Sequence, residues 1–212
     1  MTEKIFAIGD IHGCFDKLCA LMDKIKIDHD KDILLFLGDY IDRGNSSFDV
    51  VEYLIDLKKH FQKIIFLKGN HEKMLEEYLS GKNRLDYLIY GGQQTIESYM
   101  RRSRTAGSPL IPQEHLDFFK SLSLYYETDD FIFVHAGLRE NIPFEMQDPA
   151  DFLWIRKDFV HSDFDFGKRV VFGHTPYAEP LVEPNKIGID TGAVYGNKLT
   201  CVELPALLFY NV

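Results

Sequence analysis

Short apolar runs that each stop at a glycine followed by polar residues constrain this chain more than any other feature of its sequence. Three such runs stand near its start: residues 5–8 ending at Gly9-Asp10, residues 33–37 ending at Gly38-Asp39, and residues 64–67 ending at Gly69-Asn70. Residues 15–25 and 48–57 between them carry apolar side chains at helical spacing. This order predicts parallel strands with helical crossovers. The loops beyond the carboxyl ends of such strands are expected to converge on one rim.

The second half of the chain is predicted to be rich in strands. Residues 71–104 have a less regular helical pattern, interrupted by Gly81 and Gly91-Gly92, and residues 113–122 predict a further helix. The polar segment 101–109, with Arg101, Arg102 and Arg104, is predicted to be an exposed loop. Strands are predicted at residues 124–127, 131–134, 170–172, 187–190, 199–203 and 207–210. No linker divides the 212 residues, which predicts one domain spanning residues 1–212.

Composition narrows the classes of partner. A formal net charge of -9 argues against a protein whose main task is to grip a nucleic-acid backbone. The three cysteines are an odd number without zinc-finger spacing, which is typical of reduced thiols. No apolar run approaches the roughly 20 residues that span a bilayer, and no signal-peptide pattern opens the chain. We therefore expect a cytoplasmic protein without a nucleic-acid or membrane partner.

Aspartate, asparagine and histidine gather in five short segments, each of which follows an apolar run. The segments are GDIHG at residues 9–13, GDYIDRG at 38–44, GNHE at 69–72, HAG at 135–137 and GHT at 173–175. Mixed carboxylate, imidazole and amide ligands suit Mn²⁺ or Fe²⁺, and two such ions about 3.5–4 Å apart can clamp a phosphate. Asp39 is the candidate bridging ligand; Asp10 and His12 would complete one site, and Asn70, His135 and His174 the other.

Each of these residues also has an ordinary structural explanation. Asp10, Asp39 or Asn70 alone could cap a helix or form a turn, and Asp42 with Arg43 could be a surface ion pair. Five strand-end clusters with matching ligand types are improbable as independent caps, so the joint pattern predicts a metal centre. The remaining histidines, at positions 29, 60, 115 and 161, lie in polar segments and are expected to be solvated.

In this order the five segments resemble the phosphoprotein phosphatase family of the calcineurin-like metallophosphoesterases, of the small bacterial and bacteriophage type. The resemblance runs from Gly9 to Thr175, with Ile41 where valine is common and Ala136 where many members have glycine. It implies an α/β sandwich of two mixed β-sheets flanked by helices. Residues 83–112 are the expected lid or specificity insert.

The resemblance also implies roles for individual residues. Two divalent metal ions, manganese by preference with iron or zinc as alternatives, would be held by Asp10, His12, Asp39, Asn70, His135 and His174. Arg43 and Arg156 would bind the phosphate together with Asn70. His71 would protonate the leaving oxygen with Asp42 as its carboxylate partner, after direct attack by a metal-bridging hydroxide. Lys68 stands where many members carry arginine, and its role stays open.

Three functions fit this pattern. The leading prediction is a phosphoric monoester hydrolase acting on phosphoserine and phosphothreonine in proteins or peptides, with phosphotyrosine as a further substrate. The alternative is hydrolysis of dinucleoside polyphosphates, as in diadenosine tetraphosphatases, which tend to lack the aspartate of DRG and to carry GNHD. Asp42 and Glu72 favour the protein phosphatase. A catalytically silent metal-binding module is the third reading, and the complete ligand set argues against it.

Overall fold

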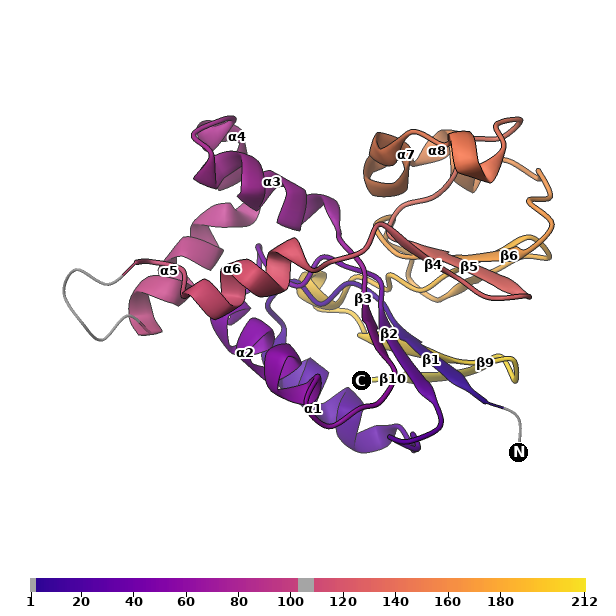
Figure 1. The fold of residues 1–212 in the computed structure, drawn as a ribbon, viewed down its shortest axis with the longest axis horizontal. Helices are drawn as coiled ribbons and strands as arrows, with labels where there is room; N and C mark the ends of the chain where they lie inside the picture. Colours follow the sequence, from indigo (N-terminus) through magenta and orange to yellow (C-terminus); the bar gives the residue numbers. More distant parts are fainter. Residues whose placement is uncertain (1–2, 103–108) are drawn as a thin grey trace.

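The computed structural model describes residues 3–102 and 109–212 and contains two five-stranded sheets (Figure 1). The first sheet has the order β10-β9-β1-β2-β3. Its strands are β1 (Ile5–Ile8), β2 (Ile33–Phe36), β3 (Ile64–Phe66), β9 (Thr200–Leu204) and β10 (Leu208–Asn211). The first three are parallel, as predicted, and the C-terminal pair adds antiparallel to β1.

The second sheet comes from the later part of the chain and has the order β4-β5-β6-β8-β7. Its strands are β4 (Tyr125–Glu127), β5 (Phe131–Val134), β6 (Arg169–Phe172), β7 (Leu181–Val182) and β8 (Lys186–Gly188). Strands β5, β6 and β8 are parallel, and the two edge strands are antiparallel to their neighbours. The expected sandwich of two mixed sheets is confirmed.

Side chains of the inner strands alternate between two cores. Ile5 and Ala7 of β1 pack with Phe133 and Val171 of the other sheet, so this core lies between the sheets. Phe6 and Ile8 of the same strand point the other way, toward the helices. Strands buried on both faces are continuous apolar runs, which is why four-residue runs were sufficient to predict them.

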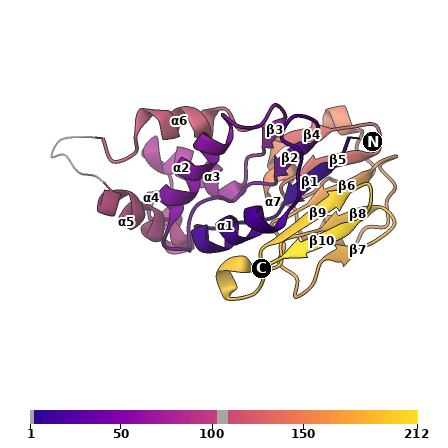
Figure 2. The same cartoon turned by 90° about the horizontal axis from the view of Figure 1, so that it is seen from below.

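Helices cover the outer faces of both sheets (Figures 1 and 2). The first sheet is covered by α1 (Phe15–Lys24), α2 (Ser47–Leu57) and α6 (Gln113–Lys120). The second is covered by α7 (Pro149–Trp154) and α8 (Lys157–Val160), whose Phe152 and Phe159 pack on Val134 and Phe172. Two 3₁₀ turns, Phe144–Met146 and Ala193–Tyr195, complete the connections.

The irregular helical stretch is divided where its glycines predicted. It consists of α3 (Asn70–Leu79), α4 (Arg84–Tyr87), the π-helix η1 (Leu88–Gly92) and α5 (Gln93–Arg102). Gly81 and Gly91, with φ of 88° and 108°, stand at the two interruptions. Positive φ is accessible to glycine at little cost, so the chain turns there. Of the predicted insert, residues 83–102 and 109–112 are described, and they carry α4, η1 and α5.

Two sequence predictions are corrected. Arg101 and Arg102 belong to α5 and not to a loop, because their guanidinium groups bind the Asn45 carbonyl and the Asp49 carboxylate. Residues 103–108 of that predicted loop, with Arg104, lie outside the described residues. His115 is buried rather than solvated, since the Tyr99 hydroxyl lies 2.7 Å from its Nδ1.

Among the described residues, no helix combines the length and apolar character that crossing a membrane requires.

Candidate metal centre

Hydrogen bonds between the loops bring the predicted segments together. The backbone N–H of His174, after β6, donates to both carboxylate oxygens of Asp10, after β1, at 3.1 and 3.0 Å. The backbone N–H of His71 donates to Oδ1 of Asp39, after β2, at 3.1 Å. The loops of both sheets therefore meet at one place, as the strand-end argument predicted.

Asp39 lies between two groups of buried ligand atoms. Its Oδ2 is 3.4 Å from Nε2 of His12 and 3.4 Å from Nε2 of His135. One group is His12, Asp39 and His71, and the other is Asp39, His135 and His174; in each, the ligand atoms lie within 4.8 Å of one another. Two His/Asp clusters that share one carboxylate are consistent with a dinuclear metal site. The shared carboxylate is the residue that the sequence predicted as the bridge.

In the second cluster, ring nitrogens and a side-chain oxygen face one another at short distance. Nδ1 of His135 donates to the Leu37 carbonyl at 2.9 Å, so Nε2 of the neutral ring is an acceptor. That Nε2 lies 3.0 Å from Oδ1 of Asn70 and 3.2 Å from Nδ1 of His174. A divalent metal ion among these atoms would satisfy them together, since imidazole, amide and carboxylate oxygen are suitable ligands for it.

The pKa of His135 also indicates that positive charge is favourable in this cluster. Burial lowers this pKa, but the carboxylates of Asp39 and Asp10 outweigh burial and raise it to about 9. A proton then supplies the charge that a metal ion would supply. Burial lowers the pKa of His174 to about 2, with His135 adding to the effect, so this ring stays neutral and can act as a ligand.

The first cluster differs in one respect from the predicted set. Burial, followed by repulsion from Asp190, raises the pKa of the Asp10 carboxyl well above its usual range. The Asp10 carboxylate accepts from the backbone of the His174 loop, and His71 occupies the third place beside His12 and Asp39. Burial lowers the pKa of His12 to about 3, and its Nδ1 lies 2.8 Å from the Ile41 carbonyl, so its Nε2 faces the cluster.

Asp42 and His71 form the predicted pair. Oδ2 of Asp42 is 2.7 Å from Nδ1 of His71, and both residues are fully buried. Oδ1 of Asp42 accepts from the Tyr87 hydroxyl at 2.8 Å and the Thr95 hydroxyl at 2.6 Å. The carboxylate is thus fixed on three sides, and His71 keeps Nε2 for another partner.

The two candidate arginines both reach the centre. Nη1 of Arg43 is 2.6 Å from Nε2 of His12, and the guanidinium lies over the Tyr195 ring at 5.7 Å. Nη1 of Arg156 donates to the His174 carbonyl at 2.9 Å. Lys68, whose role the sequence left open, binds Glu76 of α3 at 2.5 Å.

Backbone conformation and close packing hold these side chains in place. Of the eight non-glycine residues with positive φ in the described chain, five are candidate site residues: His12, Asp39, Asp42, Arg43 and His174. Such strain persists where the surroundings over-determine it, and it concentrates at functional sites. A Cβ on Gly69 would lie 2.0 Å from Oδ1 of Asp39, and one on Gly173 would lie 2.2 Å from Oδ1 of Asp10. Only glycine allows the carboxylates to approach these loops.

Glu72 is a structural member of the centre that the ligand argument missed. Its carboxylate accepts from the backbone N–H groups of Asp39, Tyr40, Ile41 and Gly69 at 2.9–3.4 Å. It therefore ties the loop after β2 to the start of α3 and fixes the bridging Asp39. Its signal in the sequence was only its place in GNHE, since the partners of a carboxylate cannot be read from spacing.

Comparisons with known proteins agree on the family. The family model described as calcineurin-like phosphoesterase matches residues 3–199. The chain is 28% identical to the bis(5′-nucleosyl)-tetraphosphatase PrpE [asymmetrical] of Bacillus cereus, over 94% of this chain and 90% of that protein. A solved structure assigned as a diadenosine tetraphosphatase superposes with a TM-score of 0.77 at 21% identity, covering 100% of this chain and 94% of the other. A protein serine/threonine phosphatase from Saccharomyces cerevisiae gives a TM-score of 0.65 at 18% identity, with 99% and 79% covered.

Proposed function

This chain belongs to the calcineurin-like phosphoesterase family, and we propose that it hydrolyses dinucleoside tetraphosphates asymmetrically. Metal-dependent phosphoester chemistry follows from the family and from the two buried clusters that share Asp39. The observation that carries the finer proposal is the likeness to asymmetrically acting bis(5′-nucleosyl)-tetraphosphatases over 94% of this chain and 90% of the relative. Asymmetrical cleavage would give a nucleoside monophosphate and a nucleoside triphosphate.

The sequence had favoured a protein phosphatase on the strength of Asp42 and Glu72. In the structure, both residues make contacts within the protein. Asp42 binds His71, Tyr87 and Thr95, and Glu72 binds four backbone N–H groups. Neither set of contacts concerns the group attached to the phosphate. These two motif positions therefore do not discriminate a protein substrate from a dinucleotide. The likeness to relatives along nearly the whole chain is the stronger argument.

In this proposal the predicted ligands keep their roles. Two divalent ions, with Mn²⁺ as the proposed metal, would be held by Asp10, His12, Asp39, Asn70, His135 and His174. When bound, such ions neutralise phosphate charge and provide a nucleophile at neutral pH.

The remaining candidate residues would bind the phosphate and protonate the departing oxygen. Arg43 and Arg156, at the two edges of the centre, would bind phosphoryl oxygens with their planar donors. His71, with Nδ1 held by Asp42, would present Nε2 to the departing oxygen and donate a proton. The surroundings that hold the backbone of Arg43 and Asp42 at positive φ keep these groups in position before substrate arrives.

A substrate comparison tests the proposal. The metal-loaded protein is given diadenosine tetraphosphate, a phosphoserine/phosphothreonine peptide and a phosphotyrosine peptide, and products are separated by chromatography. We expect the dinucleotide to have the highest kcat/KM and to yield AMP and ATP, and we expect Asp39→Asn to abolish turnover. Asp56→Asn, which changes an exposed carboxylate on α2, is the matched control. Two molecules of ADP, or faster turnover of a peptide, would contradict the proposal.

A further inference from the structure

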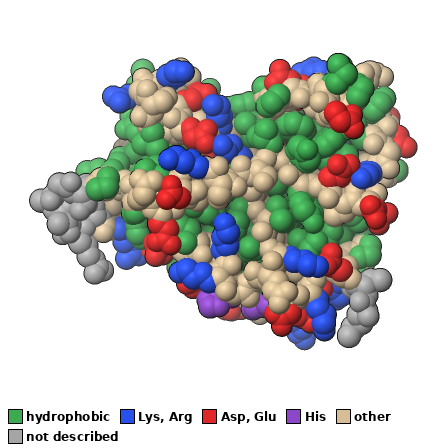
Figure 3. All heavy atoms as spheres, viewed as in Figure 1, with side chains coloured by type: hydrophobic (Ala, Val, Ile, Leu, Met, Phe, Trp, Pro, Cys, Tyr) green, Lys and Arg blue, Asp and Glu red, His purple; other side chains and the backbone are tan. Residues whose placement is uncertain are grey.

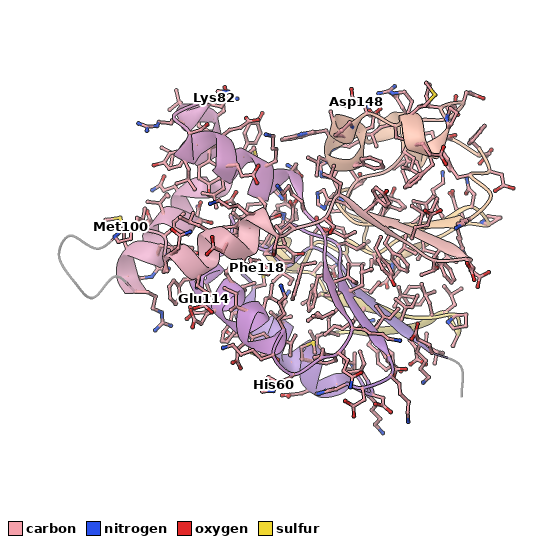
Figure 4. The ribbon with its side chains drawn as sticks, viewed as in Figure 1. His60, Lys82, Met100, Glu114, Phe118 and Asp148 are labelled. Carbon is pink, nitrogen blue, oxygen red and sulfur yellow. The ribbon has the colours of Figure 1, made fainter. Side chains whose placement is uncertain are left out.

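A cavity of about 320 Å³ opens beside the metal centre, between the segment α3–η1 and α7. Figure 3 shows the surface hollowed between these two parts of the molecule. Lys82, at the α3–α4 connection, and Asp148, before α7, mark its two sides in Figure 4. One wall comes from α3, α4 and η1, and the other is the side chain of Trp154.

Both walls contact residues of the centre. The Tyr87 hydroxyl, on the first wall, donates to Oδ1 of Asp42. The ring of Trp154, on the second wall, meets the ring of His174 edge-on, with centroids 6.4 Å apart. The cavity therefore adjoins residues of the centre.

The cavity carries exposed aromatic surface. Trp154 is 45% exposed and Tyr90 is 59% exposed, and both line it. Exposed apolar surface with a polar rim is typical of a ligand-binding groove. Flat aromatic faces suit a planar ring, and the stacking of bases on aromatic side chains is largely independent of base identity.

The charge of the cavity excludes a phosphate as its occupant. Its charged lining residues are the carboxylates of Glu77 and Asp86, and Asp86 makes no ion pair with any described residue. The cationic groups of the centre, Arg43 and Arg156, are not among its lining residues. The cavity thus suits a neutral planar group that carries hydrogen-bond donors, such as an exocyclic amino group.

We propose that this cavity binds one nucleobase of the substrate, stacked on Trp154 and Tyr90, with a base amino group or ribose hydroxyl donating to Asp86. The inference rests on the proposed function, because a base is expected only in a nucleotide substrate. It adds a binding site that would fix which phosphate of the chain lies beside the metal centre.

The single tryptophan of the chain allows a direct binding test. ATP, a product of the proposed reaction, and inorganic tripolyphosphate carry the same phosphate chain and differ in the nucleoside. Titrated into the metal-loaded protein, ATP should quench the fluorescence of Trp154, whereas tripolyphosphate should not. Tyr90→Ala retains the fluorophore and should raise the Kd for ATP about tenfold, since stacking on one aromatic ring is worth roughly 1–3 kcal/mol. Equal quenching by both compounds would overturn the inference.

Specificity ratios provide the second test. In Trp154→Ala and Tyr90→Ala, the ratio of kcat/KM for diadenosine tetraphosphate to that for 4-nitrophenyl phosphate should fall about tenfold, and Trp154→Phe should recover part of it. Leu85→Ala and Met146→Ala remove exposed apolar side chains, 70% and 74% exposed, that do not line the cavity, and they should keep the wild-type ratio.

The outcomes separate this inference from the proposed function. If dinucleotides are hydrolysed but the ratio is unchanged in both aromatic variants, the base site is wrong and the proposed function stands. If dinucleotides are not hydrolysed but ATP alone quenches Trp154, the proposed function fails and the base site stands. If the ratio that falls is that for a phosphotyrosine peptide, the cavity takes a peptide side chain and the inference is overturned.

Discussion

At the scale of single residues, Asp42 determines the state of the candidate proton donor. Tyr87 and Thr95 both donate to its Oδ1, so Oδ2 is left to face Nδ1 of His71. A carboxylate in that position orients the ring, with hydrogen on Nδ1. The hydroxyl groups that orient Asp42 come from α4 and α5, far from it in sequence.

We expect Asp42→Asn to retain the fold and lose most of its activity. The two hydroxyls would still hold the side-chain oxygen, so the new amide would turn its N–H toward Nδ1 of His71 and could no longer accept the hydrogen on that nitrogen. General acid catalysis typically contributes 10²–10⁴-fold, so kcat for phenyl phosphate should fall by about a hundredfold or more. The loss should be smaller for 4-nitrophenyl phosphate, whose leaving group needs no proton. Equal losses for both esters would contradict a role in proton donation; Asp56→Asn is the control.

The candidate metal ligands were more predictable than the residues that orient them. Asp10, Asp39, His135 and His174 each follow an apolar run, and parallel strands bring such positions together by topology. Thr95 donates to Asp42 across 53 positions, a contact that no local pattern records. His115 was misplaced for the same reason, because its burial depends on Tyr99 and Glu52 in other helices.

At the scale of elements, η1 connects the predicted insert to Arg43, the candidate phosphate-binding arginine. The Gly91 carbonyl accepts from the backbone N–H of Arg43 at 3.0 Å, and a Cβ on Gly91 would lie 2.7 Å from Cγ of Arg43. The insert therefore supports the centre with its own backbone. Helices of four to six residues such as α4 and α7 were not individually predictable, because one turn carries too little periodicity.

Two glycine substitutions separate this support from backbone strain. Gly91→Ala and Gly81→Ala both place a side chain at positive φ, which costs roughly 1–2 kcal/mol. At Gly81 the nearest atom is 3.8 Å away, so the cost should be to stability alone. At Gly91 the new methyl must displace Arg43, and kcat/KM should fall about tenfold to a hundredfold. Comparable activity of the two variants, measured where both are folded, would show that η1 does not position Arg43.

The strand pair β9–β10 contains a pH-dependent contact. Glu203 accepts from Tyr210 at 2.7 Å and pairs with Lys4 at 2.7 Å. Burial alone would raise the pKa of Glu203, but the bonds from Lys4 and Tyr210 outweigh it and lower that pKa. The folded state thus binds the proton more weakly than the unfolded state, so this contribution to stability is present above the unfolded pKa of about 4.3 and disappears as pH falls through the folded pKa.

Tyr210→Phe should therefore destabilise the protein in a pH-dependent manner. We expect a loss of about 1 kcal/mol in the free energy of unfolding at pH 7, measured with urea, because one hydrogen bond to a carboxylate is removed. The difference between wild type and variant should shrink as pH falls below the unfolded pKa of about 4.3 and through the lower folded pKa of Glu203. Tyr125→Phe, at an exposed position on the edge strand β4, is the control. A difference that is constant with pH would show that the contact is only packing.

At the scale of the whole molecule, the metal centre joins the two sheets. Asp10, Asp39 and Asn70 follow strands of the first sheet, and His135 and His174 follow strands of the second. The sequence predicted every strand except the two-residue β7, but it did not predict that β9 pairs with β1 while β8 pairs with β6, because pairing partners depend on contacts between distant segments. Ligands from both sheets mean that a bound ion opposes their separation.

Removal of metal should accordingly lower the melting temperature. Binding to the folded state alone contributes about 2.7 kcal/mol when the free ion is at 100 times its Kd, and for a chain of this size each kcal/mol shifts Tm by about 2–4 °C. We expect chelation to lower Tm by about 5–10 °C for each ion lost. Addition of Mn²⁺ should restore Tm with two ions bound per chain by elemental analysis. His174→Asn should lose most of this response, whereas His60→Asn, which changes an exposed ring at the outer end of α2 (Figure 4), should retain it. An unchanged Tm in protein shown to be metal-free would mean that the two clusters are stable without a cation, and the case for a dinuclear centre would then rest on the family alone.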